Sequence, residues 1–386
     1  MIYLDHAATT PLRPAAHAAW LRWSATESGL GNASAAHGAG RAARTAVEEA
    51  REQVATALGA QPHDIIFTSG GTEADNLAIK GIAWARADAG RRHLVTTAVE
   101  HPAVLEAATW LAEHQGFELT LVPPQRDGRV EPDRVLAAVR PDTALVSVMA
   151  ANNELGSVND IAALGAGLRE RGVPFHVDAV QAASTLDLDV GAWPVDALSL
   201  SAHKFGGPTG VGVAYLRRGV PVVPHLHGGG QDRGVRSGTF APALDAACAA
   251  ALADAVAGRS PLRERLRALS DRLADAVATA GGVRRNGPTD ATLRLASHVH
   301  LSIAGVDAEA LLWSLDQSGV AVSIGSACHS GANDGSHVLR ACGLDDLAGL
   351  RLSLGWTTTA DEVAQAGDVI VEAIDKLRAV GGGGVQ

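Results

Sequence analysis

The chain has 386 residues, of which 47% are hydrophobic and 19% charged, and its formal net charge is -10. This length allows two or three domains around a large core, and the negative charge disfavours direct binding to nucleic acid. The sequence has no basic leader before an apolar segment and no run of about 18 apolar residues that would cross a membrane, so we expect a cytoplasmic protein.

Short β-branched runs alternate with longer amphipathic segments from residue 60 to about residue 220. The runs are IIFT, HLVTT, FELTLV, ALVSVM, VPFHV, ALSLS and VGVAYL. This alternation predicts βαβ units, and therefore an α/β domain on a mostly parallel, seven-stranded sheet. Since ligands bind beyond the carboxyl ends of the strands in such sheets, the residues that follow each run are the candidate site residues.

The rest of the chain predicts a bridge and a second, smaller α/β domain. A long helical stretch rich in Ala, Leu and Arg is expected at residues 243–280, and strand and helix patterns alternate again from HVHLSI onward. We therefore expect a large domain at residues 15–255 and a small domain formed by residues 1–14 and 256–386.

Three of the predicted strands are followed by polar groups with distinct chemistry. Thr72 lies in a Gly-rich turn before a helix, where exposed N–H groups and the helix dipole favour a phosphate. Asp178, with Gln181 three residues later, could pair with a protonated ring nitrogen. Lys204 lies beside His203 in a Gly-rich turn, as suits a Schiff-base lysine. A helix N-cap is the structural alternative for Thr72 and Asp178.

Two further polar residues follow other strands. His101, in TTAVEHPAV, could stack on a flat cofactor or carry a proton, and Asn153 lies in ANNELG. Either residue alone could be an ordinary surface group. Because all these residues fall where one cofactor could meet them, a shared site explains them better than coincidence.

The stretch SIGSACHSG places Cys328 among residues with little side-chain bulk. Cys328 is either a structural thiol or a nucleophile on a mobile loop, and His329 either helps to form its thiolate or faces solvent. Cys248 and Cys342 lie in apolar segments typical of buried cysteines. The odd number of cysteines and the lack of a CxxC pair indicate neither a disulfide framework nor a structural zinc site.

Taken together, these segments resemble the cysteine desulfurases, which are pyridoxal-phosphate enzymes of the class V aminotransferase group with the fold-type I architecture. The matching segments are YLDHAATTP, TSGGTEADNLAIKG, EHPAVL, NNELG, HVDAVQ, SAHKFGGPTGVG, HGGGQDRGVRSGT, GSACHSG and LRLSLG. They follow the family order over nearly the whole chain. The cysteine segment resembles the branch of the family with a long mobile cysteine loop.

The resemblance implies which residues hold pyridoxal 5'-phosphate. Lys204 would form the Schiff base and then move protons, and Asp178 would keep the pyridine nitrogen protonated. Gln181 would hydrogen-bond the phenolic oxygen, His101 would stack on the ring and assist proton transfer, and Asn153 would also contact the cofactor. The phosphate ligands implied are Thr72, Ser201 and His203, with Thr239 from the second subunit of a homodimer.

The reaction implied by the resemblance is conversion of L-cysteine to L-alanine. Asn153 and Arg351 would receive the substrate carboxylate, which the planar fork of an arginine matches. The Cys328 thiolate would attack the substrate Sγ and hold the sulfur as a persulfide. A sulfur-acceptor protein would then take it for iron–sulfur cluster assembly or another thiolation pathway. Such a thiol needs a loop of small residues, as in SIGSACHSG.

The chain departs from the family pattern at three positions. It has His329 where the family usually has Thr, Ile324 where Ser or Thr is common, and Ala202 where Gly is usual. None of these changes removes a catalytic group.

Three alternative functions are compatible with parts of the pattern. A lyase of the same fold that releases sulfide or selenium would keep its activity without Cys328. A transaminase would have no use for a lone mobile cysteine. A non-catalytic sulfur carrier would not require Lys204, Asp178 and Arg351 together.

Overall fold

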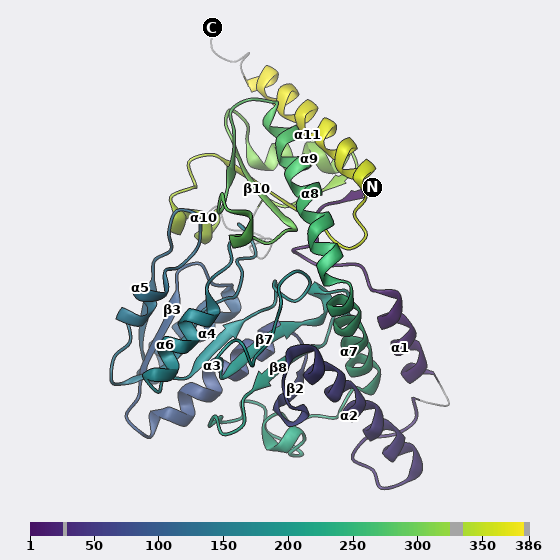
Figure 1. Cartoon of the computed structure of the whole chain (residues 1–386), viewed down its shortest axis with the longest axis vertical. Helices are drawn as coiled ribbons and strands as arrows, with labels where there is room; N and C mark the ends of the chain where they lie inside the picture. Colours follow the sequence, from purple (N-terminus) through teal and green to yellow (C-terminus); the bar gives the residue numbers. More distant parts are fainter. Residues whose placement is uncertain (26–28, 325–334, 382–386) are drawn as a thin grey trace.

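The computed structural model describes residues 1–25, 29–324 and 335–381. A seven-stranded sheet forms the larger part of the molecule, and its strand order is β2-β8-β7-β6-β5-β3-β4 (Figure 1). Its strands are β2 (Ile65–Thr68), β3 (His93–Thr97), β4 (Glu118–Val122), β5 (Thr143–Ser147), β6 (Phe175–Asp178), β7 (Ala197–Ser201) and β8 (Gly212–Leu216). Only β8 runs antiparallel to its neighbours, so the prediction of a mostly parallel, seven-stranded sheet is confirmed.

Most strands of this sheet are buried along their whole length because helices cover both faces of the sheet. Every residue of β2, β3, β5, β6, β7 and β8 is buried, whereas the edge strand β4 is partly exposed. The covering helices are α1 (Pro14–Ser24), α2 (Gly38–Leu58), α3 (Gly71–Ala87), α4 (Pro102–Gln115), α5 (Pro132–Ala137), α6 (Ile161–Glu170) and α7 (Pro242–Ala257). Short 3-10 turns lie at η1 (Pro62–Asp64), η2 (Ala202–Lys204) and η3 (Asp232–Gly234).

The helix boundaries follow local chemistry. Proline occupies the first turn of α1, α4, α5 and α7, where its missing N–H needs no partner. Gly59 and Gly116 end α2 and α4 with φ of 65° and 66°, a left-handed conformation that glycine adopts without steric cost. The prolines therefore mark where these helices begin, and the glycines mark where α2 and α4 end.

The helical stretch predicted at residues 243–280 is present, and it consists of two helices. Helix α7 ends at Gly258 and α8 (Arg259–Ala278) begins directly after it. Gly258 has φ -93° and ψ 2°, and Pro261 follows in the first turn of α8. Pro261 has no N–H to donate to the carbonyl of Ala257, and Gly258 has a non-helical conformation, so the hydrogen-bond ladder is interrupted at this point. Helix α8 then runs from the large sheet to the smaller part (Figure 1).

The smaller part contains an antiparallel sheet in the order β12-β10-β9 and a parallel pair, β1-β11. Its strands are β1 (Ile2–Tyr3), β9 (Val283–Asn286), β10 (His298–Ile303), β11 (Val320–Ala321) and β12 (Ala348–Ser353). Its other elements are η4 (Ala291–Leu293), α9 (Ala308–Gln317), α10 (His337–Cys342) and α11 (Ala360–Gly381). The N-terminal strand thus pairs with a strand of the C-terminal part of the chain.

Separate hydrophobic clusters lie in the two parts. Leu4, Leu301, Leu350 and Ile370 belong to the cluster of the small sheet, whereas the buried side chains of α10 belong to the cluster of the large sheet. Helix α10 therefore packs on the large core although it follows the small sheet in the sequence. The boundary at residues 255 and 256 stays a prediction.

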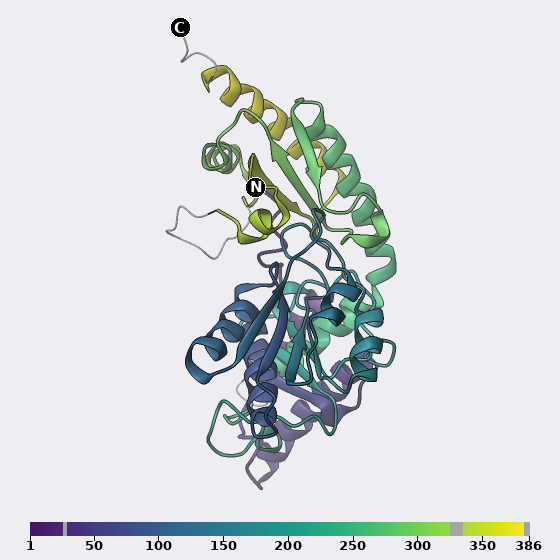
Figure 2. The ribbon, with the colours of Figure 1, turned by 90° about the vertical axis from the view of Figure 1, so that its left-hand side faces the viewer.

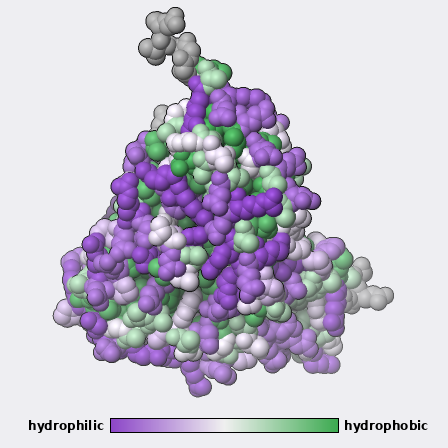
Figure 3. Space-filling model, turned by 45° about the horizontal axis from the view of Figure 1, so that its top comes forward, coloured by the Kyte–Doolittle hydropathy of each residue, from purple (hydrophilic) through white to green (hydrophobic). Residues whose placement is uncertain are grey.

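Seen from the side, the small sheet and its helices stack on one end of the large part (Figure 2). The face in Figure 3 is covered mostly by hydrophilic residues, with hydrophobic residues in small scattered groups. Within the described ranges, no helix is both long and apolar enough to cross a membrane.

Candidate active site

A cavity of about 300 Å³ lies where the carboxyl ends of β2, β3, β5, β6 and β7 face the smaller part of the molecule. This volume suits a small-molecule site. The predicted residues that line it are Thr72, His101, Asn153, Asp178, Gln181, Ser201, His203, Lys204 and Arg351. The structure therefore brings together residues that the sequence placed after separate strands.

The remaining predicted residues lie elsewhere. Thr239 is exposed in the loop before α7 and does not line the cavity. Cys328 and His329 lie outside the described residues. Of the two other departures from the family pattern, Ala202 is buried and Ile324 is half-buried.

The start of α3 and the end of β7 both line the cavity, through Thr72 and Ser201. Thr72 is in the first turn of α3, where free N–H groups and the helix dipole favour an anion. Ser201 ends β7, and a Cβ added at Gly71 would lie 2.8 Å from Val180 Cγ2. Glycine at position 71 therefore lets the helix start close to the strand ends.

Two histidines of the cavity are neutral at pH 7. Burial, followed by the charge of Lys204, lowers the pKa of both His101 and His203 to about 4. The Nδ1 of His101 accepts a hydrogen bond from the Ala103 N–H at 3.1 Å, so its proton lies on Nε2. His101 thus presents a flat, uncharged ring with one N–H donor.

Asp178 is the buried acid of the cavity, and it is 5% exposed. Burial raises its pKa to about 6, although the Val180 N–H, at 2.9 Å from Oδ1, and Lys204 both act in the opposite direction. Asp178 is therefore mostly ionised at pH 7 and is suited to hold a positive charge nearby.

Arg351 lies on β12 of the three-stranded sheet and is 3% exposed. Its Nη2 donates to Asp5 Oδ1 at 2.8 Å and its Nη1 to the Asn153 carbonyl at 3.2 Å. Within the described part of the chain, Arg351 Nε and Asn153 Oδ1 are buried and have no hydrogen-bond partner. Since buried polar atoms are normally paired, these two atoms indicate a polar ligand.

The cavity also contains Asp75, Glu154 and His337, which the sequence interpretation did not select. Asp75 follows Thr72 by three residues on α3, so helical periodicity could have placed it on the same face. Burial and the charge of Asp178 raise the pKa of Asp75 well above its usual range. Glu154 lies in the ANNELG segment beside Asn153, whereas His337 carries no local signal.

Comparison with known proteins agrees with this geometry. The family model for aminotransferase class-V matches residues 2–365. An IscS-like cysteine desulfurase of Mycobacterium tuberculosis is 48% identical and covers 98% of this chain and 97% of that protein. The chain belongs to the class-V aminotransferase family, among its IscS-like cysteine desulfurases.

Two solved structures have folds similar to that of this desulfurase. A NifS-like protein matches with a TM-score of 0.90 and 33% identity, over 97% of this chain and 100% of that one. SspA, solved in complex with cysteine, matches with a TM-score of 0.80 and 34% identity, over 92% and 99%. The desulfurase activity implies a cysteine substrate, and the family implies pyridoxal phosphate.

The two cysteines that the structure describes are poor nucleophiles. Cys248 and Cys342 are buried and free. Burial raises the pKa of Cys248 strongly and that of Cys342 to about 12, so both thiols stay protonated at pH 7. Neither is suited to accept sulfur from a substrate.

Proposed function

We propose that this desulfurase binds pyridoxal 5'-phosphate in the 300 Å³ cavity and transfers sulfur from L-cysteine to Cys328. The observation that carries the proposal is that Lys204, the ionised Asp178 and the unfilled hydrogen-bonding capacity of Arg351 all face this cavity. A lysine, an acid for a ring nitrogen and a carboxylate receptor are the groups that pyridoxal-phosphate chemistry on an amino acid requires.

The residues present fit the cofactor. Thr72, Ser201 and His203 would hold its phosphate at the start of α3, and Asp178 would face its pyridine nitrogen. Gln181 would donate to the phenolic oxygen, and the neutral His101 would stack on the ring. When bound, the cofactor supplies a sink for the electrons released at the substrate Cα.

Each residue then has a defined task. Lys204 attaches the cofactor and carries the substrate α-proton, while Asp178 keeps the ring nitrogen protonated. Asn153 and Arg351 orient the substrate through its carboxylate, because the guanidinium offers Nε in addition to the Nη atoms already paired.

The residues on either side of the Cys328 segment support the role of Cys328 as the nucleophile. Ser323 pairs with Arg351 through both backbone hydrogen bonds, at 3.2 and 2.7 Å. On the other side, the Ser336 hydroxyl donates to Glu154 Oε2 at 2.6 Å, and Glu154 lines the cavity. Cys328 follows Ser323 by five residues, a span of up to about 17 Å, so its sulfur can reach a substrate held by Arg351.

The sulfur transfer is balanced without an external oxidant. The thiolate of Cys328 attacks Sγ, an S–S bond forms, and the Cβ–Sγ bond breaks. Protonation of Cβ then yields alanine, and the persulfide passes to an acceptor protein for iron–sulfur cluster assembly or another thiolation pathway. A persulfide relay needs reduced thiols, which favours the cytoplasm as its compartment.

We further propose a homodimer as the active unit. Thr239 is exposed at the end of a loop that Arg236 ties to Glu73 in the first turn of α3, at 2.9 Å. Its exposure leaves the Thr239 side chain accessible to a partner subunit, which supports a role in that subunit's site.

Alanine release from L-cysteine tests the proposed nucleophile. The protein is loaded with pyridoxal phosphate and compared with Cys328→Ala and with Cys342→Ala as the matched cysteine control. We expect the parent and Cys342→Ala to form alanine and Cys328→Ala to form none while it keeps the cofactor absorbance. Equal alanine release with free sulfide from Cys328→Ala would instead favour the sulfide-releasing lyase.

A further inference from the structure

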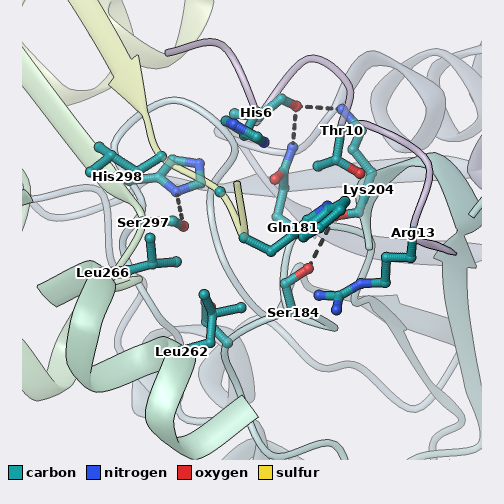
Figure 4. Close-up of a pocket in the computed structure, with 15 residues that line it drawn as sticks. His6, Thr10, Arg13, Gln181, Ser184, Lys204, Leu262, Leu266, Ser297 and His298 are labelled. Carbon is teal, nitrogen blue, oxygen red and sulfur yellow. Dashed lines mark hydrogen bonds between the residues drawn. The ribbon is translucent and has the colours of Figure 1, made fainter. Parts of the chain in front are cut away.

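The amine of Lys204 is hydrogen-bonded to the backbone of the N-terminal segment. Its Nζ donates hydrogen bonds to the carbonyl oxygens of Ala7 and Ala8, the latter at 2.9 Å. The Ala7 carbonyl also accepts a hydrogen bond from Gln181 Nε2 at 2.9 Å (Figure 4). Carbonyl oxygens only accept hydrogen bonds, so this arrangement suits an ammonium group, which only donates.

The turn that supplies these carbonyls is fixed to strand β12. The Ala7 N–H donates to Ser353 Oγ at 2.8 Å, and the Ala8 N–H donates to the Asp5 carbonyl at 3.0 Å. Ala7 and Ser353 are both buried. The packing is tight as well, because a Cβ added at Gly355 would overlap the ring of His6.

The same strand carries the substrate-binding arginine. Asp5, two residues before Ala7, accepts a hydrogen bond from Arg351 at 2.8 Å, and Ser353 is two residues beyond Arg351. Strand β12 therefore fixes two groups relative to each other. One is the turn whose carbonyls bind the Lys204 amine, and the other is the Arg351 guanidinium, which would bind the substrate carboxylate.

Ala7, Gln181 and Lys204 line the cavity of about 300 Å³ and also a second cavity of about 30 Å³. In Figure 4, Gln181 and Lys204 are seen in the second cavity. Its histidines, His6 and His298, are neutral because burial lowers their pKa to about 4 and about 3. The titratable groups that respond to the charge of Lys204 are Asp178, His101, His203 and His298. Since the three histidines are uncharged at pH 7, they do not oppose an ammonium at this position.

We propose that the Ala7 and Ala8 carbonyls form a seat for the Lys204 ammonium whenever Lys204 is not attached to the cofactor, and that Ser353 is the positioning residue of this seat. The inference rests on the proposed function of Lys204. In the step concerned, the neutral amine takes the proton from the substrate Cα, and the electron pair of the C–H bond stays with the cofactor-bound substrate. The seat favours this transfer because it binds the ammonium better than the amine.

The test uses the cofactor-free full-length protein, so it does not depend on catalysis. The chain has three lysines, Lys80, Lys204 and Lys376, and NMR of protein labelled with ¹³C at lysine Cε can follow each one. Lys80→Arg and Lys376→Arg assign the signals. In Ser353→Ala we expect Lys204 to lose its proton at a pH about one unit lower than in the parent, since its acceptors are less well placed. The matched control is Ser302→Ala, another buried, hydrogen-bonded serine of the small sheet, which should leave the midpoint unchanged.

An unchanged Lys204 midpoint in folded Ser353→Ala would overturn the inference. If Ser353→Ala does not fold, a crystal structure of the parent, loaded with pyridoxal phosphate and soaked with L-alanine, decides the question. We expect Lys204 Nζ within hydrogen-bonding distance of both carbonyl oxygens, and its placement elsewhere would refute the seat. A protein that never binds the cofactor would contradict the proposed function instead, so the two failures are distinguishable.

Discussion

Replacing Arg351 by lysine should weaken cysteine binding without removing the cofactor. The guanidinium of Arg351 is 3% exposed and already donates to Asp5 and to the Asn153 carbonyl, while its Nε has no partner among the residues that the structure covers. A lysine keeps the positive charge but has a single nitrogen. It therefore cannot hold Asp5 and the substrate carboxylate with the same geometry.

The size of the effect follows from the number of hydrogen bonds lost. A hydrogen bond to a charged group contributes about 1.5 to 3 kcal/mol. The loss of one hydrogen bond between the guanidinium and the substrate carboxylate should therefore lower kcat/KM by about tenfold to a hundredfold. The loss of stability should be smaller, because Asp5 is 19% exposed and water can solvate its carboxylate.

The assay is the initial rate of alanine release as a function of L-cysteine concentration, after an absorbance scan shows equal cofactor loading. We expect KM to rise in Arg351→Lys. The matched control is Arg294→Lys, since Arg294 is also an ion-paired arginine, bound to Asp271 at 2.7 Å. If KM for cysteine is the same in Arg351→Lys, the parent and Arg294→Lys, another group must receive the carboxylate.

Three further changes test other parts of the site. Lys204→Ala should lose the absorbance band of covalently attached cofactor and release the cofactor on gel filtration; a retained band would remove Lys204 from its role. Asp178→Asn should reduce alanine formation by about a hundredfold or more, because an amide cannot keep the ring nitrogen protonated, and parent-like rates would exclude that function. Burial raises the pKa of Glu100 from 4.5 to about 8, so the folded protein holds a proton that the unfolded chain releases above about pH 4.5. The contribution of Glu100 to stability should therefore fall as pH rises from about 4.5 to about 8, whereas the buried neutral histidines act in the opposite direction below about pH 6.5. The melting temperature of cofactor-free Glu100→Gln relative to that of the parent should therefore rise between pH 5 and pH 8; a constant difference would contradict the shifted pKa.

The large sheet and most of the site were predictable because their signals are local. Seven β-branched runs gave the seven strands, and residues after those strands, such as Asp178 and Lys204, meet in one cavity. This follows from parallel topology, which brings the carboxyl ends of the strands to one edge.

Features that depend on tertiary packing were not predictable in the same way. The break at Gly258 was hidden by the helical pattern on both sides of it. His337 reaches the cavity because α10 packs on the large core, and Asp5 meets Arg351 across 346 positions of the chain. The residue pattern within one segment does not predict contacts between distant segments.

The most direct test of the account is mass spectrometry of the peptide that contains Cys328 after one turnover with L-cysteine and no acceptor. We predict a mass gain of one sulfur atom on Cys328, in an amount equal to the alanine formed, and an unmodified Cys248 and Cys342. Stoichiometric alanine with an unmodified Cys328 would contradict the proposed route of the sulfur.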